Sequence, residues 1–542
     1  MAAGLLFVLL AVVTCGSSIR HAFEIGADEH YEVMKGLLWA RGYPLYTRVW
    51  NDQPPLLTVL LGLAFKLFGP QIVVARALAV FFGALLVGGL FHFARRASGP
   101  LAASVAAFCL VAAPEVFKLT ISAMLEVPAI AVGLWALWPI QRWAEDRRPR
   151  WPVCSGLIMA TALQAKLTAA ILGPALAAEI LLISLGPCRA SPPVPPLGRA
   201  RTPCAPEDGG CGSADPTMSG STPTWRGGLR SALGSLLVWL GAAVGGFILL
   251  GVVFGSGYRQ AWESHFSGKT PQALAESGQL AFSPALLLDH TEALWGLGAA
   301  LVVLIWKRSL RRPAFPLALL ATAAAIHLLH RPYWPYYYLH FAVPIAWLTG
   351  LATAELGKAA WAGLTAGLAG PAGRAGPETA SCGDRKPSAG WPWRPWLVGM
   401  AAWAAAGCVM AVLGSYGASR LLWEIGLVRA QPRIEDDALL AAMKRYAPRT
   451  RWAYAENTMY AFHARLCVIP ELAVMPRKRW WSGHITQDHI VALVKQYRPE
   501  QMLLPAQGTL ESQICQSMGA DYTVACEGSA YRLFVAKPVP DL

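Results

Sequence analysis

Long uncharged apolar runs dominate the first 420 residues of the chain. A run of about 17–25 such residues predicts a helix that crosses a lipid bilayer. The first run, 2–19, is interpreted as an uncleaved span, because no basic residue precedes it and no clear small-residue cleavage site follows it. Ten further candidate spans occupy about 71–94, 100–117, 125–140, 152–167, 168–186, 231–254, 292–306, 314–330, 340–357 and 396–416. The pattern predicts a polytopic α-helical membrane protein with about 11 spans.

Three stretches of the first 420 residues depart from this pattern. The apolar segment 54–68 is too short to cross a bilayer and is bounded by Gln53 and Gly69, so we expect an interfacial or re-entrant helix there. Segments 187–230 and 358–395 are rich in Pro, Gly and Ser. Such segments bury too little apolar area to offset their chain entropy, so both are predicted to be flexible cytoplasmic linkers.

Charged residues return from about Pro432. Short periodic segments predict helices within 433–447 and 488–500, and strands within 451–457, 501–506 and 531–538. We therefore expect two domains, a transmembrane domain at 1–420 and a small soluble α/β domain at 421–542.

Composition and charge support the membrane assignment. Only 14% of the residues are charged and the mean hydropathy is +0.40, whereas ordinary globular chains are about 25% charged. A net charge of +14 would suggest nucleic acid in a soluble protein. Here the short basic loops, at 95–96, 142–150 and 307–312, all fall on one side if the N-terminus is cytoplasmic. This orientation explains the charge without nucleic acid, and it places 20–70 and 417–542 outside.

Acidic residues gather on the predicted outer face. Asp28 and Glu29 directly follow the first span, and Asp52 precedes two prolines at the start of an apolar helix. Glu126 begins a later span. A single carboxylate at a membrane boundary is commonly a solvated loop residue, but a carboxylate inside the membrane is costly and often functional.

These motifs, taken in order, resemble the GT-C membrane glycosyltransferases. More narrowly they resemble glycosyltransferase family 39, which includes protein O-mannosyltransferases and the lipid A aminoarabinose transferase. The resemblance rests on the acidic pair, on the acidic-x-Pro-Pro start of a helix ending in FKLFG (65–69), and on later segments. Those segments are LEVPAIAVGLWAL (125–137), LQAKLTAAILGPAL (163–176), HRPYWPYYYLHFAVPIAWLTG (330–350) and IPELAVMPRKRWWSGHIT (469–486).

The resemblance implies an inverting hexosyl- or pentosyltransferase. Such an enzyme moves a sugar from a polyprenyl-phosphate donor to a hydroxyl of a lipid, glycan or protein acceptor on the extracytoplasmic face. It needs no nucleotide cofactor, and the chain shows no P-loop or GxGxxG motif. The implied location is the plasma membrane, expected to be a bacterial inner membrane, where the chain is multi-pass and in contact with the bilayer.

Roles for individual residues also follow from the resemblance. Asp28 is the expected general base, and Glu29 is a second acid or a structural partner. Asp52 and His265 would hold a divalent metal ion. The candidates for binding the donor phosphate and its sugar are Gln53, Glu126, Lys166, His330, Arg331, Tyr336, Tyr337 and His340. Gln53 stands where the aminoarabinose enzyme carries a lysine, so the donor phosphate needs its cation from elsewhere.

Two other classes of protein fit parts of the pattern. A transporter or flippase of a lipid-linked sugar should show two related halves and ionisable groups near the bilayer midplane. The chain shows no convincing internal repeat, and its acids gather at one face. A non-catalytic membrane scaffold would have no need for those acids together with a lysine. The basic and aromatic run 477–481 is interpreted as a contact between the outer domain and the membrane surface, with a contact to the acceptor as the alternative.

Overall fold

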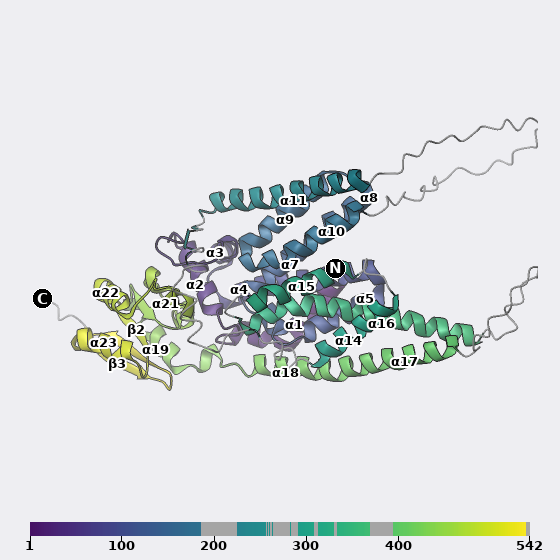
Figure 1. The fold of residues 1–542 in the computed structure, drawn as a ribbon. Helices are drawn as coiled ribbons and strands as arrows, with labels where there is room; N and C mark the ends of the chain where they lie inside the picture. The colour runs from purple at the N-terminus through teal and green to yellow at the C-terminus, as the bar shows by residue number, and fades with distance from the viewer. Residues whose placement is uncertain are drawn as a thin grey trace, which may run out of the picture.

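The structure, a computed structural model, describes residues 1–185, 225–255, 291–307, 313–329, 333–368 and 394–537, and five single residues between 257 and 282. Two regions differ in composition. A large helical region covers most of the chain, and a smaller region with a sheet lies at its C-terminal end (Figure 1).

The helical region is built from apolar runs whose breaks fall at glycines, prolines and charged residues. Its elements are α1 (Ala2–His21), α2 (Glu29–Ala40), α3 (Leu56–Phe68), α4 (Ile72–Ser98), α5 (Pro100–Ala112), α6 (Val116–Thr120), α7 (Glu126–Trp135), α8 (Leu137–Asp146), α9 (Arg150–Ala165), the 3₁₀ helix η1 (Leu167–Leu172), α10 (Gly173–Leu185), α11 (Trp225–Val253), α14 (Thr291–Lys307), α15 (Ala314–Leu329), the 3₁₀ helix η3 (Pro335–Tyr338), α16 (Leu339–Leu368), α17 (Arg394–Val412), the π-helical turn η5 (Leu413–Gly417) and α18 (Ala418–Arg429).

Every predicted span contains a helix, but the number of spans is not confirmed. Six described helical segments are long and apolar enough to cross a membrane, and four shorter apolar helices accompany them. The predicted spans 100–117 and 125–140 are each divided into two helices. Segment 54–68, expected as an interfacial or re-entrant helix, contains α3. The fold class is therefore confirmed as a largely helical membrane protein with a small C-terminal sheet. The predicted number of 11 spans is not confirmed.

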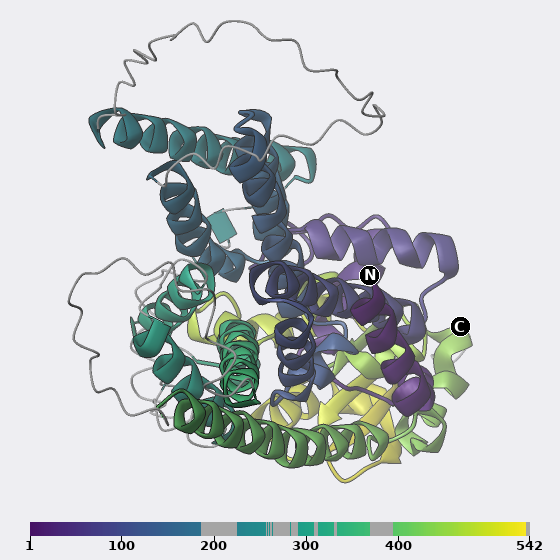
Figure 2. The ribbon, with the colours of Figure 1, turned by 90° about the vertical axis from the view of Figure 1, so that its right-hand side faces the viewer.

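The helices form two packed groups. Helix α11 packs against α9 and α10 in one group (Figure 2), and this group joins the other through contacts of α9 with α7 and of α10 with α15. In the other group α16 packs against α5, α14 and α17, and α4 packs against α1, α5 and α7. Both predicted linkers overlap helices, because α11 begins at Trp225 and α16 continues to Leu368; their other residues, 187–224 and 369–393, lie outside the described residues.

The C-terminal region contains a four-stranded sheet with short helices around it. Its helices are the 3₁₀ turns η6 (Ile434–Asp436), η7 (Ala447–Arg449), η8 (Pro470–Leu472) and η9 (Gly519–Asp521), and the α-helices α19 (Ala438–Tyr446), α20 (Thr458–His463), α21 (Arg477–Trp481), α22 (Gln487–Tyr497) and α23 (Thr509–Met518). The strands are β1 (Ala453–Ala455), β2 (Gln501–Pro505), β3 (Tyr522–Glu527) and β4 (Tyr531–Ala536), in the order β1-β2-β4-β3.

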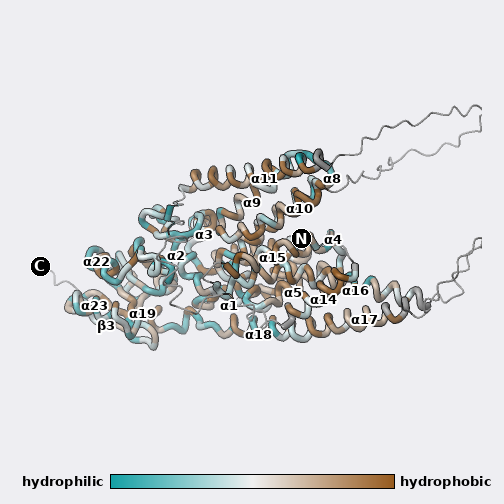
Figure 3. Tube along the Cα trace, in the orientation of Figure 1, coloured by the Kyte–Doolittle hydropathy of each residue, from teal (hydrophilic) through white to brown (hydrophobic). Residues whose placement is uncertain are grey.

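Pairing within this sheet is mixed. Strand β1 is parallel to β2, and β4 is antiparallel to both β2 and β3. One face of the sheet packs against α22 and α23 through residues such as Met502, Leu504 and Ile514. Hydrophilic residues gather at this end of the molecule, whereas apolar residues dominate the helical region (Figure 3).

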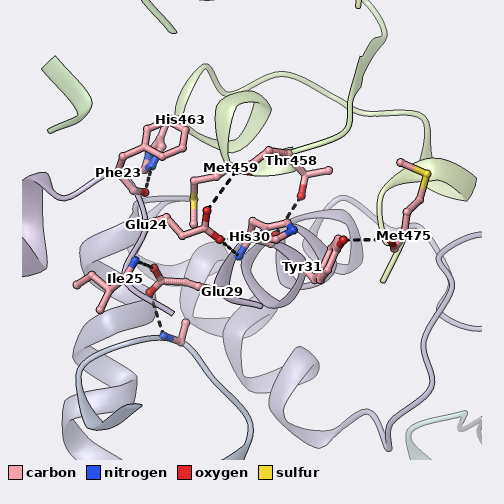
Figure 4. Close-up of polar contacts among 12 residues, drawn as sticks. Phe23, Glu24, Ile25, Glu29, His30, Tyr31, Thr458, Met459, His463 and Met475 are labelled. Atoms are coloured by element: carbon pink, nitrogen blue, oxygen red, sulfur yellow. Dashed lines mark hydrogen bonds and ion pairs between the residues drawn. The ribbon is translucent and has the colours of Figure 1, made fainter. Parts of the chain in front are cut away.

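The C-terminal region packs directly on the segment between α1 and α3. The backbone nitrogen of Phe23 donates to the carbonyl of Pro432 at 2.7 Å, and the ring of His463 lies 2.8 Å from the carbonyl of Phe23. The Tyr31 hydroxyl donates to the carbonyl of Met475 at 3.1 Å (Figure 4). Burial lowers the pKa of His463 to about 4, so the ring is neutral near pH 7 and donates to this carbonyl. The two regions therefore meet at the segment that carries the predicted acids.

Candidate active site

Glu29 is completely buried, and its carboxylate is fully occupied. Arg76 of α4 contacts it twice, with Nε to Oε1 at 3.0 Å and Nη2 to Oε2 at 2.8 Å. The backbone nitrogens of Ile25 and Ala123 donate to the same carboxylate at 2.8 and 3.0 Å (Figure 4). Burial alone would raise the pKa of Glu29, but Arg76 and these four hydrogen bonds hold it below its ordinary value.

Arg76 continues this network toward α1. Its Nη1 donates to the carbonyls of Ser18, Ile19 and Ala22 at the end of that helix, at 2.8–3.3 Å. The pair therefore joins α1, α2, α4 and the loop that precedes α7. Of the two roles predicted for Glu29, this geometry favours the structural partner over the second acid.

Asp28, next in the chain to Glu29, has the opposite environment. It precedes α2 in the N-cap position, yet among the described residues its carboxylate accepts no hydrogen bond, and it is partly exposed. Burial, followed by the nearby Glu126 carboxylate, raises the pKa of Asp28, while Lys166 and His30 act in the opposite direction. Asp28 is thus an uncommitted carboxylate, meaning one that accepts no hydrogen bond among the described residues, and its pKa responds to the charges of Glu126 and Lys166.

Glu126 and Lys166 form a buried ion pair and are 1% and 6% exposed. Glu126 begins α7, and Lys166 follows the last residue of α9, where the chain turns extended before η1. Close packing at Gly133 brings these elements together, since a Cβ there would lie 2.4 Å from Leu172 of η1. The second carboxylate oxygen of Glu126 is buried and has no hydrogen-bond partner among the described residues.

Aromatic and imidazole rings surround Lys166. Its Nζ lies 5.1 Å from the ring centre of Tyr336 and 5.4 Å from that of Tyr337, within the range of cation–π contacts. His340 stacks on Tyr337 and lies 2.9 Å from the ring nitrogen of His327. The other nitrogen of His340 is buried and has no partner among the described residues. The predicted residues His330 and Arg331 lie outside the described residues.

Asp52 is contacted by a lysine from the far end of the chain. The Nζ of Lys478, in α21, lies 3.2 Å from its Oδ2. The amide nitrogen of Gln53 lies 3.4 Å from the same oxygen, which is a weak contact. The main chain here is fixed by Asn51 and Tyr46, which both donate to the carbonyl of Gln53 at 2.8 Å.

The described residues around Asp52 do not fit the predicted metal ion. The carboxylate faces an ammonium group where a cation would bind, and no cluster of three or more His, Cys, Asp or Glu side chains occurs among the described residues. His265, the other predicted ligand, lies outside them. The metal therefore stays a prediction, and no chemical step is assigned to it.

Comparison with known proteins identifies the fold. Residues 52–195 match the dolichyl-phosphate-mannose-protein mannosyltransferase family, and this segment contains Asp52, Glu126 and Lys166. The whole chain is similar to the crystal structure of ArnT from Cupriavidus metallidurans bound to undecaprenyl phosphate, with a TM-score of 0.55, 17% identity and 99% coverage of each chain. The apo structure of ArnT gives a TM-score of 0.56, 16% identity and the same coverage.

The chain has a GT-C fold. The resemblance predicted from the sequence motifs is thereby confirmed at the level of the fold, and the chain is a multi-pass membrane protein. No curated protein matches the chain in sequence.

Within this GT-C fold the structure adds residues that the sequence did not indicate. Arg76 lies inside an apolar run and was counted as part of a span, so it gave no signal of its own. Lys478 belongs to the run 477–481, which was interpreted as a membrane contact. In the structure Lys478 instead faces Asp52, and Arg479 is buried against the carbonyls of Glu471 and Val474, whereas the membrane contact of the run as a whole stays a prediction.

Proposed function

We propose that the chain is an integral-membrane inverting glycosyltransferase that uses a polyprenyl-phosphate sugar as its donor. The observation that carries this proposal is the buried Lys166–Glu126 pair with tyrosine rings beside Lys166, together with Asp28, a carboxylate without a cap hydrogen bond whose pKa is affected by both members of the pair. The GT-C fold supports it, as does the bound undecaprenyl phosphate in the similar ArnT structure. The acceptor hydroxyl is proposed to react on the extracytoplasmic face of the plasma membrane.

The proposed reaction is a single displacement. The acceptor oxygen forms a bond to the anomeric carbon, the bond from that carbon to the phosphate oxygen breaks, and the lipid phosphate leaves with the electron pair. Asp28 takes the acceptor proton as the general base. Lys166 stabilises the negative charge that develops on the departing phosphate, because a fixed cation in a water-poor site binds such charge strongly.

Two buried polar atoms support a ligand at this site. The free carboxylate oxygen of Glu126 and the free ring nitrogen of His340 are buried, and neither has a partner among the described residues. A buried polar atom without a hydrogen bond costs about 1–3 kcal/mol. We propose that a sugar hydroxyl of the donor donates to the Glu126 oxygen and that a sugar hydroxyl or a phosphate oxygen pairs with the His340 nitrogen, with Tyr336 and Tyr337 as the wall of the pocket.

Replacing Lys166 by Met together with Glu126 by Gln is expected to weaken the binding of a polyprenyl phosphate. The double change avoids leaving one buried charge unpaired. Loss of a charge-assisted hydrogen bond predicts roughly 10-fold to 100-fold weaker binding. Binding of undecaprenyl phosphate to the purified protein is the measurement. Lys118→Met, at a more exposed ion pair with Glu115, is the control and should bind normally. Equal affinity of the double variant and the wild type would contradict the proposed donor.

The proposed orientation predicts which residues a membrane-impermeant maleimide labels in intact cells. Cysteines introduced at the exposed Thr47 and Gln507 should react from outside, and one at the exposed Arg150 should not. The background should lack Cys467, Cys515 and Cys526, which are free thiols in the C-terminal region. Labelling at position 150 without labelling at positions 47 and 507 would contradict the proposed orientation and indicate the opposite one.

A further inference from the structure

An apolar groove of about 970 Å³ lies between α1 and α4. The two helices approach closely at Gly4, where a Cβ would lie 2.8 Å from the carbonyl oxygen of Ala84. Leu5, Val12 and Phe81 line the groove and are more than half exposed. No described segment of the protein covers these side chains, so in a bilayer they are in contact with lipid chains.

One end of the groove is basic. Arg20 and His21, in the last turn of α1, line the groove at this end. Two further hollows, of about 410 and 590 Å³, share His21 with the groove. The smaller hollow adds Arg429 and Arg433, and the larger one adds Arg465. These four arginines, all of them exposed, are called the basic end.

Carboxylates do not balance the charge of the basic end. Glu435 is the one acidic side chain among the described residues that line the groove and the two hollows, and its Oε1 lies 2.6 Å from the ring of His21. Asp436 and Asp437 are next in the chain, but neither lines any of the three cavities. Four guanidinium groups therefore face a single carboxylate.

Contacts within the protein hold the basic end in place. Arg76 of α4 donates to three backbone carbonyls at the end of α1, which fixes that end against α4. The Nε of Arg429 donates to the carbonyl of Thr14 at 2.6 Å, which joins α18 to α1. The backbone nitrogen of Phe23 donates to the carbonyl of Pro432, directly before Arg433. A site that is already ordered loses little conformational freedom when a ligand binds.

An anionic glycerophospholipid matches both parts of this surface. Its acyl chains cover apolar side chains, and its phosphate lies at the membrane interface, where arginine binds phosphate oxygens through charge-assisted hydrogen bonds. In the proposed orientation the basic end is extracytoplasmic, whereas Lys and Arg beside membrane spans are ordinarily concentrated on the cytoplasmic side. A bound anion gives a local reason for this exception.

We propose that the groove between α1 and α4, together with its basic end, is a binding site for an anionic glycerophospholipid of the bilayer. The acyl chains lie along the groove, and the phosphate lies among the arginines of the basic end. None of the described residues assigned to the proposed active site lines the groove or the two hollows. The inference goes beyond the proposed function, and sugar transfer is not part of its test.

Binding of phosphatidylglycerol and of phosphatidylcholine to the purified full-length protein, followed by native mass spectrometry, tests the inference. The wild type should bind phosphatidylglycerol roughly 10-fold more tightly, because the choline group cancels the charge that the arginines attract. Arg20→Gln combined with Arg433→Gln should remove most of this preference. Arg445→Gln combined with Arg449→Gln is the matched control, since it removes two exposed arginines that line none of the three cavities.

A second variant tests the groove without changing any charge. Gly16 lines the groove, and a Cβ there would meet only Val12, at 3.9 Å. Gly16→Leu fills this space and suits a helix better than glycine does, so it should weaken the binding of phosphatidylglycerol several-fold without destabilising the protein. Thermal unfolding of each variant without added lipid should match the wild type.

Three results would overturn the inference. The first is equal binding of the two lipids by the wild type. The second is an unchanged preference in the Arg20 and Arg433 double variant, or an equal loss in the control, since net charge alone would then explain the binding. The third is displacement of phosphatidylglycerol by an equal concentration of undecaprenyl phosphate, which would assign the groove to a polyprenyl phosphate instead.

Discussion

Replacing Asp28 by Asn is expected to lower the rate of sugar transfer by roughly 10²-fold to 10⁴-fold, the usual contribution of a general base. Asparagine keeps the size of the side chain but cannot take the acceptor proton. Donor affinity should change little, because Lys166 and the tyrosine rings are expected to hold the donor. Single-turnover transfer and donor binding, measured on the same preparation, separate these two effects.

The pH dependence of the wild type provides a second signature of the same residue. A base must be deprotonated, so transfer should rise with pH through the pKa of Asp28 and be lost as the pH falls below it. Burial and Glu126 raise this pKa above its ordinary value, so the loss should occur at a higher pH than for an ordinary aspartate. The Asn variant should lack this acidic limb.

A matched control keeps the test of Asp28 specific. Asp488 is an exposed aspartate at the start of α22, far along the chain from the site. Asp488→Asn should transfer sugar at the normal rate. Near-normal transfer by Asp28→Asn would show that the base is another residue, with Glu126 as the next candidate.

Replacing Glu29 by Gln is expected to destabilise the fold by about 3–5 kcal/mol, the cost of leaving a buried charge without its partner. The change leaves the completely buried Arg76 with three backbone carbonyls and no counter-charge. Because this network joins three helices, the loss should lower the melting temperature of the whole protein. Thermal unfolding of purified Glu29→Gln measures the effect.

An exposed ion pair serves as the comparison for Glu29. Glu145 contacts Arg96, and both side chains are more than one third exposed. Such pairs contribute about 0–1 kcal/mol, so Glu145→Gln should unfold close to the wild-type temperature. Asp28→Asn should do the same. A Glu29→Gln variant that is stable but inactive would instead make Glu29 a catalytic residue.

Much of the fold could be predicted because its signals are local. Apolar runs indicated where helices occur. Helix α19 and the strands β1, β2 and β4 lie within the predicted segments, and α22 begins one residue before its predicted segment. Strand β3 was not predicted, since at the edge of the sheet it is mostly exposed and carries little apolar pattern. Helix α2 was also missed, because its buried face includes the charged residues Glu29, Glu32 and Lys35, so its sequence looks like a polar loop.

The sequence indicated individual candidate residues of the site, but not which of them lie together in space. Asp28, Glu126 and Lys166 stood out because charges are rare beside apolar spans. Their grouping depends on how the helices pack, which sequence periodicity does not indicate. Lys478 and Asp52 are separated by 426 positions, and nothing local to either residue indicates the other.

Transfer of a radiolabelled sugar by the purified protein tests the central claim most directly. The protein in nanodiscs is incubated with radiolabelled polyprenyl-phosphate sugars and a membrane extract that supplies acceptors. The Asp28→Asn variant is assayed in the same way, and in a separate reaction soluble nucleotide sugars replace the lipid donor. The account predicts that label leaves the lipid donor for an acceptor with the wild type only, and that nucleotide sugars give no product. Turnover of a nucleotide sugar, or retention of all label on the polyprenyl phosphate, would contradict it.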